Sequence, residues 1–318
     1  MRRLLSVLIV IAGLSCATRV RAQEDACLRR VIAASVIGTR GAVFSDLTAA
    51  NFEASIHHKP VRIVSVIRDE SPRRVIVALD ASGSMHDNWK GNIALARSLM
   101  ESSRPDDEMG LVTFSDRVLD IVPLTRERGP LSVEFAQLSE SAEYSPKGLT
   151  AVWDALASIS EQFGHPQFGD SIFMLSDGQD NRSRIAESKV ESMMIGKGIR
   201  VFGLALPPGN WGREIREPRA EGQPAAPEIN TGGFGVFFSS PPRVDESLPI
   251  AADASGRQTV VATARFQLHM IQTVEKIDIE LPQRIERPEQ WTLSVHGVSD
   301  PRLRVVYPHT LRVCSARD

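Results

Sequence analysis

An alternation of apolar runs and amphipathic segments, beginning at residue 73, constrains the fold most strongly. RRVIVAL, residues 73–79, contains a continuous apolar run, which is typical of a strand buried on both faces of a parallel sheet. Further strands are expected in MGLVTFS, VLDIVPLT, SIFMLSDG and IRVFGLAL, and helices in NIALARSLMES, TAVWDALASISEQF and RIAESKVESMMIGKG. This order predicts an α/β fold with a doubly wound, mostly parallel sheet flanked by helices.

Segments rich in β-branched residues lie on both sides of this region. In residues 23–72 we expect DLTAANFEASIHHKPVRIV to form a short helix, a strand and a tight turn. In residues 241–318, ARFQLHM, KIDIEL, WTLSVHGV and LRVVY alternate or run apolar between Pro and Gly residues, which predicts antiparallel strands. The predicted organisation is an N-terminal β segment (23–72), an α/β domain (73–240) and a C-terminal β segment (241–318), with both β segments forming one small accessory unit.

Residues 207–228 contain five prolines and no apolar periodicity, which predicts an exposed loop inserted after the IRVFGLAL strand. Ligands of doubly wound sheets bind at the carboxyl ends of the strands, so this loop is expected to begin on the ligand-binding rim. Trp211 lies in this loop, where packing in an apolar core is hard to explain. We therefore predict that Trp211, Arg213 and Arg216 contribute to a partner surface.

The N-terminus has the features of a secretory signal peptide. Arg2 and Arg3 precede the apolar stretch LLSVLIVIAGL, and residues 20–22 supply small or apolar side chains before Gln23. The apolar stretch is shorter than the roughly 20 residues that a membrane-spanning helix needs. We therefore predict a cleaved signal peptide over residues 1–22 and an exported protein that is periplasmic, at the cell surface or secreted.

The chain has three cysteines. Cys16 lies in the predicted signal peptide, and lipid attachment there is a minor alternative, because Gly13 stands where a bulky aliphatic residue is expected. Cys27 and Cys314 remain near opposite ends of the mature chain, where an oxidising compartment favours a disulfide between them. Two unpaired thiols are the alternative, since sequence separation does not show whether their Cα atoms come within bridging distance.

Composition and missing motifs argue against several classes of function. Lys and Arg number 37 against 39 Asp and Glu, so the basic surplus that is typical of nucleic-acid binders is absent. The sequence contains no GxxxxGK[ST] phosphate loop, no HExxH and no GxSxG around its serines. Ser82, Ser84, His86 and Asp80 are almost contiguous, whereas triad members usually converge from separate elements. We therefore predict that the protein is not an enzyme.

The stretch DASGSM follows the VIVAL run directly and supplies one carboxylate and two hydroxyls. Positions i, i+2 and i+4 of an extended segment share a face, so Asp80, Ser82 and Ser84 are expected to converge. Thr150, at the start of a predicted helix, and Asp177, at the end of a predicted strand, face the same edge of the sheet. These hard oxygen ligands suit Mg²⁺, Mn²⁺ or Ca²⁺, and the sequence predicts a site for one such ion.

This pattern resembles the von Willebrand factor A (VWA) family, whose metal-ion-dependent adhesion site (MIDAS) combines D-x-S-x-S with a downstream Thr and a downstream Asp. All five positions are matched in this chain. The resemblance covers residues 73–240 and implies that the serines and the threonine contact the ion directly while the aspartates act partly through water, with Mg²⁺ the first choice of metal. The flanking β segments are similar to those of exported VWA-related proteins of Acidobacteria.

The resemblance also implies a function. It implies a non-enzymatic protein that mediates cation-dependent protein–protein interaction or adhesion, in which the ion captures an acidic side chain of a partner protein. Neither a nucleic-acid partner nor a membrane span in the mature chain is expected. The alternative is a structural or scaffold component of a cell-envelope assembly, in which the metal mainly stabilises the fold.

Overall fold

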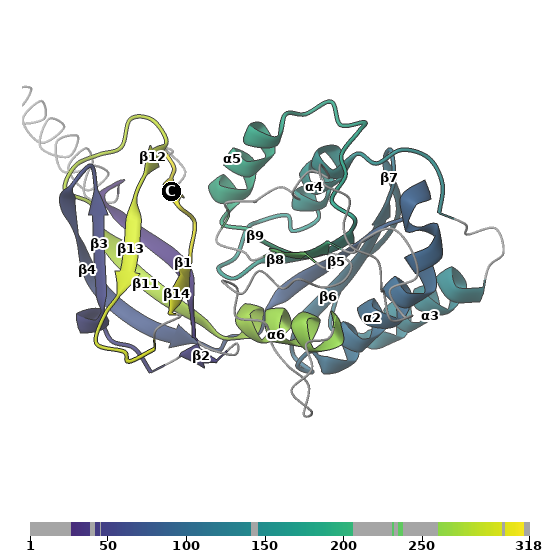
Figure 1. Ribbon diagram of the computed structural model, residues 1–318, viewed down its shortest axis with the longest axis horizontal. Helices are drawn as coiled ribbons and strands as arrows, with labels where there is room; N and C mark the ends of the chain where they lie inside the picture. The colour runs from purple at the N-terminus through teal and green to yellow at the C-terminus, as the bar shows by residue number, and fades with distance from the viewer. Residues whose placement is uncertain are drawn as a thin grey trace, which may run out of the picture.

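The computed structural model describes residues 27–38, 42–44, 46–140, 146–205, 231, 235–237, 260–300 and 303–314. In these residues the chain forms an α/β domain and a β unit that lie side by side (Figure 1). The predicted signal peptide with Cys16 lies outside the described residues. So does the predicted Pro-rich insertion with Trp211, Arg213 and Arg216.

The sheet of the α/β domain has the strand order β10-β9-β8-β5-β6-β7. In chain order its strands are β5 (Arg74–Asp80), β6 (Glu108–Phe114), β7 (Val118–Thr125), β8 (Ser171–Ser176), β9 (Arg200–Ala205) and β10 (Gly235–Phe237). The pairings from β10 to β6 are parallel, as predicted, and only β7 is antiparallel to its neighbour in this sheet of described strands. Residues 115–117 are too short for the crossover that a parallel pair would need.

Helices cover both faces of this sheet (Figure 1). They are α2 (Trp89–Ser102), α3 (Arg128–Glu140) and α6 (Val260–Gln272) on one face, and α4 (Val152–Glu161) and α5 (Glu187–Lys197) on the other. Alternate residues of β5 lie on opposite faces of the sheet. Val77 is buried in the core with α2, α3 and α6, and Ile76 is buried in the core with α4 and α5. Burial on both sides explains why β5 is apolar throughout its length.

Helix α6 corrects one prediction, because ARFQLHM (residues 264–270) is helical and not a strand. Phe266 and Leu268 are buried in the core of the α/β domain. Gln267 is also buried, and its Nε2 donates a hydrogen bond to the carbonyl of Gly203 in β9 at 3.0 Å. The predicted C-terminal β segment (241–318) is therefore not wholly β, since α6 covers the sheet of the α/β domain.

The end of α6 is held by three arginines at the junction with the β unit. Guanidinium nitrogens of Arg200, Arg73 and Arg104 donate to the successive carbonyls of Met270, Ile271 and Gln272, at 3.4, 3.1 and 2.7 Å. Cations are favourable at this position because the C-terminal end of a helix carries partial negative charge.

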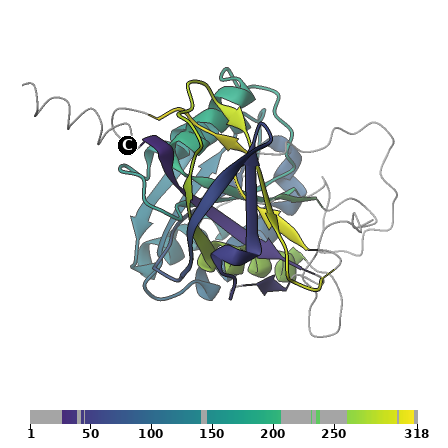
Figure 2. The ribbon, with the colours of Figure 1, turned by 90° about the vertical axis from the view of Figure 1, so that its left-hand side faces the viewer.

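Strands from both chain ends form the β unit, as predicted (Figure 2). They are β1 (Arg29–Ile37), β2 (Val43–Phe44), β3 (Phe52–Ile56), β4 (Lys59–Asp69), β11 (Val274–Glu280), β13 (Thr292–Val295) and β14 (Arg304–Val306), with the short pair β12 (Glu289–Gln290) and β15 (Thr310–Leu311). The larger sheet has the order β13-β3-β4-β11-β1-β14, with β2 paired to β1. N-terminal β1 thus pairs with C-terminal β11 and β14, both antiparallel.

The N-terminal segment contains the expected short helix, strand and tight turn. The helix is a 3-10 turn, η2 (Ala49–Asn51), which leads into β3. His57 and His58 connect β3 to β4 with φ values of 48° and 62°. Two consecutive positive φ values are what the tight turn of a two-residue hairpin requires.

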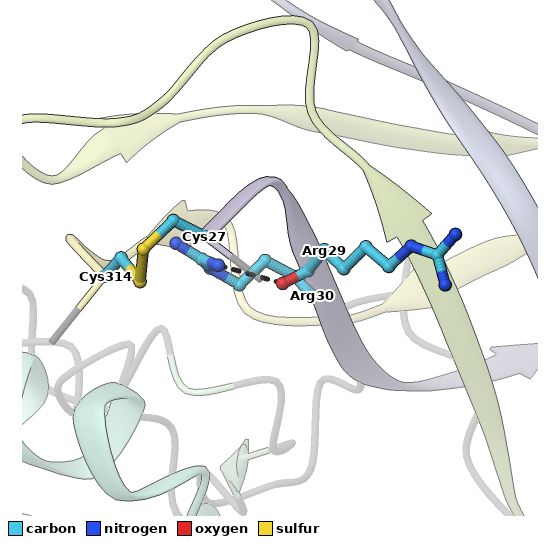
Figure 3. The surroundings of a disulfide bond; sticks show 4 residues. All are labelled: Cys27, Arg29, Arg30 and Cys314. Atoms are coloured by element: carbon cyan, nitrogen blue, oxygen red, sulfur yellow. Dashed lines mark hydrogen bonds between the residues drawn. A yellow bond between two sulfur atoms is a disulfide. The ribbon is translucent and has the colours of Figure 1, made fainter. Parts of the chain in front are cut away.

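A disulfide joins Cys27 and Cys314, whose Cα atoms are 5.4 Å apart (Figure 3). Of the two alternatives left open by the sequence, the structure therefore contains the bonded one. Cys27 lies just before β1 and Cys314 just after β15, so the bond ties together the two chain ends of the β unit.

Candidate metal centre

Asp80 is the last residue of β5 and is fully buried. Its Oδ1 accepts a hydrogen bond from the backbone N–H of Ser82 at 2.9 Å, and its Oδ2 accepts one from the hydroxyl of Ser176 at 2.6 Å. Burial raises the pKa of Asp80 to about 6, and the Asp177 carboxylate acts in the same direction while the two hydrogen bonds oppose the rise. Two neighbouring carboxylates repel each other when both are ionised, so a cation bound beside them would be stabilising.

The two serines of the motif lie next to each other because of a helical turn that the sequence did not predict. Ser82 is extended and buried, and the chain turns directly after it into the 3-10 helix η3 (Gly83–Asn88). Ser84 lies in that turn, with its hydroxyl 3.2 Å from the hydroxyl of Ser82, and is exposed. The shared-face reasoning therefore holds for Asp80 and Ser82, and the helical turn brings Ser84 beside them.

The loop that carries Thr150 is hydrogen-bonded to the motif. The N–H of Lys147 donates to the carbonyl of Ala81 at 3.0 Å, and the N–H of Gly83 donates to the carbonyl of Gly148 at 3.1 Å. Gly148 has a φ of 88°, which a glycine adopts without strain. Thr150 itself is buried, two residues before α4.

Asp177 follows β8, and its two carboxylate oxygens have different surroundings. Its Oδ1 accepts a hydrogen bond from the N–H of Gln179 at 3.0 Å, whereas its Oδ2 is buried without a hydrogen-bond partner. The turn that follows is bonded to the Thr150 loop, because Asn181 Oδ1 accepts from the N–H of Thr150 at 2.9 Å. A buried carboxylate oxygen without a donor is costly, and a bound cation would remove that cost.

The residues present fit a hard divalent cation. Backbone hydrogen bonds join the loop before α4 to the loops after β5 and β8. These loops carry two carboxylates and three hydroxyls, all of them oxygen ligands of the kind that Mg²⁺ or Ca²⁺ takes. Among the described residues, no three His, Cys, Asp or Glu side chains gather in a group that could hold a metal. An ion at this edge would therefore depend on the hydroxyls of Ser82, Ser84 and Thr150.

Comparison with known families shows the family of the chain. The family model described as "VWA domain containing CoxE-like protein" matches residues 28–227. The chain belongs to this VWA family. The match begins near the start of β1, so it includes the N-terminal β segment as well as most of the predicted α/β domain (73–240). None of the curated proteins matches the chain.

Three of the solved structures similar to this VWA protein come from bacteria and from a mussel. BatB of Bacteroides thetaiotaomicron is 22% identical, with 52% of this chain and 90% of BatB covered and a TM-score of 0.37. An aerotolerance-related membrane protein of Bacteroides fragilis is 18% identical, with coverages of 63% and 98% and a TM-score of 0.42. Proximal thread matrix protein 1 of the mussel byssus, with a zinc-occupied MIDAS, is 15% identical, with coverages of 67% and 49% and a TM-score of 0.40.

Ser176 contacts a residue of the candidate site, and the sequence did not reveal this role. Its hydroxyl accepts a hydrogen bond from the N–H of Gly178 at 3.0 Å and donates its single proton to Asp80 Oδ2. It therefore connects the carboxylate at the end of β5 to the turn that carries Asp177. The available signal was its place directly before Asp177 at the end of a buried strand.

The start of α4 in the VWA domain is capped by side chains from a distant loop. Asp180 Oδ1 accepts from the N–H of Val152 at 2.8 Å, and the hydroxyl of Ser183 accepts from the N–H groups of Trp153 and Asp154 at 3.0 and 3.2 Å. These bonds satisfy N–H groups that have no partner inside the helix. They hold the Thr150 loop against the turn that contains Asp177.

Proposed function

We propose that this VWA protein mediates divalent-cation-dependent protein–protein interaction or adhesion. The cation would be held by a MIDAS made of Asp80, Ser82, Ser84, Thr150 and Asp177. The observation that carries the proposal is the buried Oδ2 of Asp177, which has no hydrogen-bond partner at an edge lined with oxygen ligands. A bound cation would give this oxygen a partner.

An ion held mainly by neutral hydroxyls keeps most of its charge, and Ser84 is exposed to solvent. Such an ion supplies Lewis acidity for one further oxygen ligand, and we propose that a partner protein's Asp or Glu carboxylate takes that place. The role is one of binding, and no enzymatic activity is proposed. Mg²⁺ is the ion we propose, with Mn²⁺ and Ca²⁺ as alternatives, because all three prefer oxygen ligands.

Export is part of the proposal. It is supported by the signal-peptide pattern of residues 1–22 and by the disulfide between Cys27 and Cys314, which an oxidising compartment favours. Among the described residues, no helix is long and apolar enough to cross a membrane. Mass analysis of the processed protein is expected to find Gln23 at its N-terminus, and an intact residue 1 would contradict cleavage.

A scaffold role is the second candidate, and one observation favours it. Arg200, which is fully buried in the α/β domain, donates to the hydroxyl of Ser35 in β1 at 2.9 Å, so the two parts share a buried polar contact. In that role the metal would raise stability while partner contacts used other surfaces. Removal of the metal by a chelator would then lower the unfolding midpoint without releasing a bound partner.

Calorimetric titration with Mg²⁺, Mn²⁺ and Ca²⁺ tests the proposal. The wild-type protein is expected to bind one ion, and Asp177→Asn to lose that binding while remaining folded. Asp87→Asn is the matched control, because Asp87 lies in η3 close to the motif but is exposed. A folded wild-type protein that binds none of the three ions would contradict the proposed site.

A further inference from the structure

The surface beside the candidate metal centre has an unusual apolar residue. Leu149 is 48% exposed and immediately precedes Thr150, which is buried. Among the exposed large aliphatic side chains of the described residues, Leu149 is the one next in sequence to a predicted metal ligand. Single exposed aliphatic residues are common on protein surfaces, so its significance depends on how it is held and on what surrounds it.

The backbone on both sides of Leu149 is fixed to the site. Lys147 and Gly148 are bonded to the DASGSM loop, and a Cβ placed on Gly83 would lie 3.4 Å from the carbonyl of Gly148. On the other side, the Thr150 carbonyl accepts from the N–H groups of Asn181 and Arg182, both at 3.0 Å. Consecutive Cα atoms are about 3.8 Å apart, so Leu149 is held beside Thr150 and would lose little freedom on binding a partner.

Two exposed cations accompany Leu149 at this edge. Lys147 and Arg182 are exposed, and neither forms an ion pair with another residue in the part of the chain that the structure describes. Two nearby carboxylates already have donors within the protein. Asp180 accepts hydrogen bonds from Val152 and Ser183, and Asp116 pairs with Arg117 at 3.1 Å. Lys147 and Arg182 can therefore face acidic groups of a docking segment.

We propose that the partner segment is acidic and carries an aliphatic side chain next to the carboxylate that binds the metal. The carboxylate would bind the ion, the aliphatic side chain would pack on Leu149, and additional acidic residues would face Lys147 and Arg182. Charge complementarity supports this occupant, because the ion and both cations favour negative charge. The inference rests on the proposed function and specifies the class of partner.

Acetylated peptide amides attached to a biosensor surface test the inference with the wild-type protein in saturating Mg²⁺. The reference peptide contains Glu-Glu-Asp-Leu, and a second places Leu before Asp, because the structure does not fix the direction of the segment. Replacing Asp by Asn is expected to abolish binding. Replacing Leu by Ser is expected to weaken binding about tenfold through lost apolar burial, and replacing both Glu by Gln about threefold.

Variants of the protein assign these effects to residues. Leu149→Ser is expected to remove the preference for Leu over Ser while leaving the Mg²⁺ dependence intact. Val133→Ser, a change at an aliphatic residue of α3 that is 58% exposed, is the matched control and is expected to leave both unchanged. Lys147→Gln with Arg182→Gln is expected to remove the preference for Glu over Gln, and Lys189→Gln, at an exposed position of α5, is its control.

The possible failures are distinguishable. Mg²⁺-dependent binding that is equally strong for Leu and Ser peptides would overturn this inference and leave the proposed function standing. Absence of Mg²⁺-dependent binding for every Asp peptide would contradict the proposed function as well. Since the peptide comparison uses the wild-type protein, it decides the matter even if a variant does not fold.

Discussion

The two ends of strand β5 both bury charged side chains, but they satisfy them differently. At the amino end, the backbone N–H of Arg73 donates to Asp107 Oδ1 at 2.7 Å, and the Arg73 guanidinium pairs with Asp69 at 3.4 Å. At the carboxyl end, Asp80 has donors for both of its oxygens, but the neighbouring Asp177 keeps a buried Oδ2 without one. Arg73 Nη1 is also buried without a hydrogen-bond partner, but at the amino end arginine and aspartate side chains offset each other's charge. At the carboxyl end, neither Asp80 nor Asp177 forms an ion pair with another described residue, so a cation from outside the chain would be stabilising there.

This difference indicates which end of the VWA domain is structural. The amino end joins the α/β domain to the β unit through helix α6, whose last carbonyls accept from three arginines. Burial, together with the charge of Arg73, lowers the pKa of Arg200 to about 9. Changes at this end should therefore affect stability, and changes at the carboxyl end should affect metal affinity.

The largest effect is expected from Asp107→Ala at the amino end. Asp107 is fully buried and accepts from the N–H groups of Arg73 and Arg104 and from the Nε2 of Gln272 at 2.9 Å. Removing the carboxylate leaves these donors and the nearby guanidinium groups uncompensated, which should lower the free energy of unfolding by about 3–5 kcal/mol. Denaturant titration measures the change.

The control for this prediction is Asp106→Ala, because Asp106 is the exposed neighbour of Asp107. It is expected to change the free energy of unfolding by less than about 0.5 kcal/mol. If Asp107→Ala were as mild as its control, or if it abolished metal binding in a folded protein, the division between the two ends would be wrong.

The next largest effect, a loss of stability, is expected when the disulfide of the β unit is removed. The bond closes a loop with a sequence separation of 287 residues, so Cys27→Ser with Cys314→Ser is expected to cost about 2–5 kcal/mol of stability. Metal affinity should stay within a factor of two of wild type, since the bond joins the chain ends of the β unit. A thermal unfolding series with and without Mg²⁺ provides both quantities, and an unchanged midpoint would contradict the expected stabilisation.

At the carboxyl end, Ser176→Ala is expected to weaken Mg²⁺ binding about 10- to 100-fold, the usual effect of losing a group that orients a metal ligand. The variant removes the hydroxyl that donates to Asp80 at 2.6 Å. Ser176→Thr keeps that donor and should recover most of the affinity, which a purely structural role would not predict. Ser158→Ala, at an exposed position of α4, is the control, and calorimetry is the measurement.

Glu275 in β11 offers the smallest expected effect and a contrast to Asp177. Burial raises the pKa of Glu275 to about 7, opposed by Arg68 and assisted by Asp46, and its Oε2 has no hydrogen-bond partner. Because the folded pKa lies above the ordinary 4.5, this group's stabilisation is complete below about pH 4.5 and is lost as the pH rises toward 7. Glu275→Gln should therefore gain about 1–2 kcal/mol relative to wild type above pH 7.

Unfolding midpoints at pH 5 and pH 8 check this sign. The advantage of Glu275→Gln should be larger at pH 8, whereas the exposed control Glu53→Gln should show no such dependence. Mg²⁺ should not reduce the advantage, because Glu275 lies in β11 and not in the loops that carry the predicted metal ligands. An advantage that is larger at pH 5 would contradict the assignment.

Local patterns predicted much of this fold, and long-range contacts explain the errors. Strand β5 was predictable because burial on both faces leaves an apolar run. ARFQLHM alternates apolar and polar residues as a strand would, but it is helical, and the buried Gln267 is accommodated by the carbonyl of Gly203, 64 residues away. Helix α3 was not predicted, since Gly129 and Pro130 obscure its start, although Pro is well tolerated in a first helical turn.

In the candidate site, too, local patterns were predictable and long-range contacts were not. The positions of the predicted ligands at one edge of the sheet were predictable because these residues follow recognisable strands or precede a helix. That they bind an ion stays a prediction. The contribution of Ser176 was not predictable, because its partner Asp80 is 96 residues away. The capping of α4 was not predictable either, because Asp180 accepts a hydrogen bond from a backbone N–H 28 residues away. Sequence patterns indicate which residues can bind an ion, whereas the residues that orient them depend on the folded chain.

The most direct test of the central claim uses Mn²⁺ as a paramagnetic probe of the carboxyl end. Mn²⁺ bound to the protein is mixed with acetyl-aspartate amide labelled with carbon-13 in its side-chain carboxylate, and the coupling between ion and label is measured by electron–nuclear double resonance. We expect a coupling in the wild-type protein and none in Asp177→Asn. Tightly bound Mn²⁺ without any coupling to the labelled carboxylate would show a closed site and contradict capture of a partner's acidic side chain.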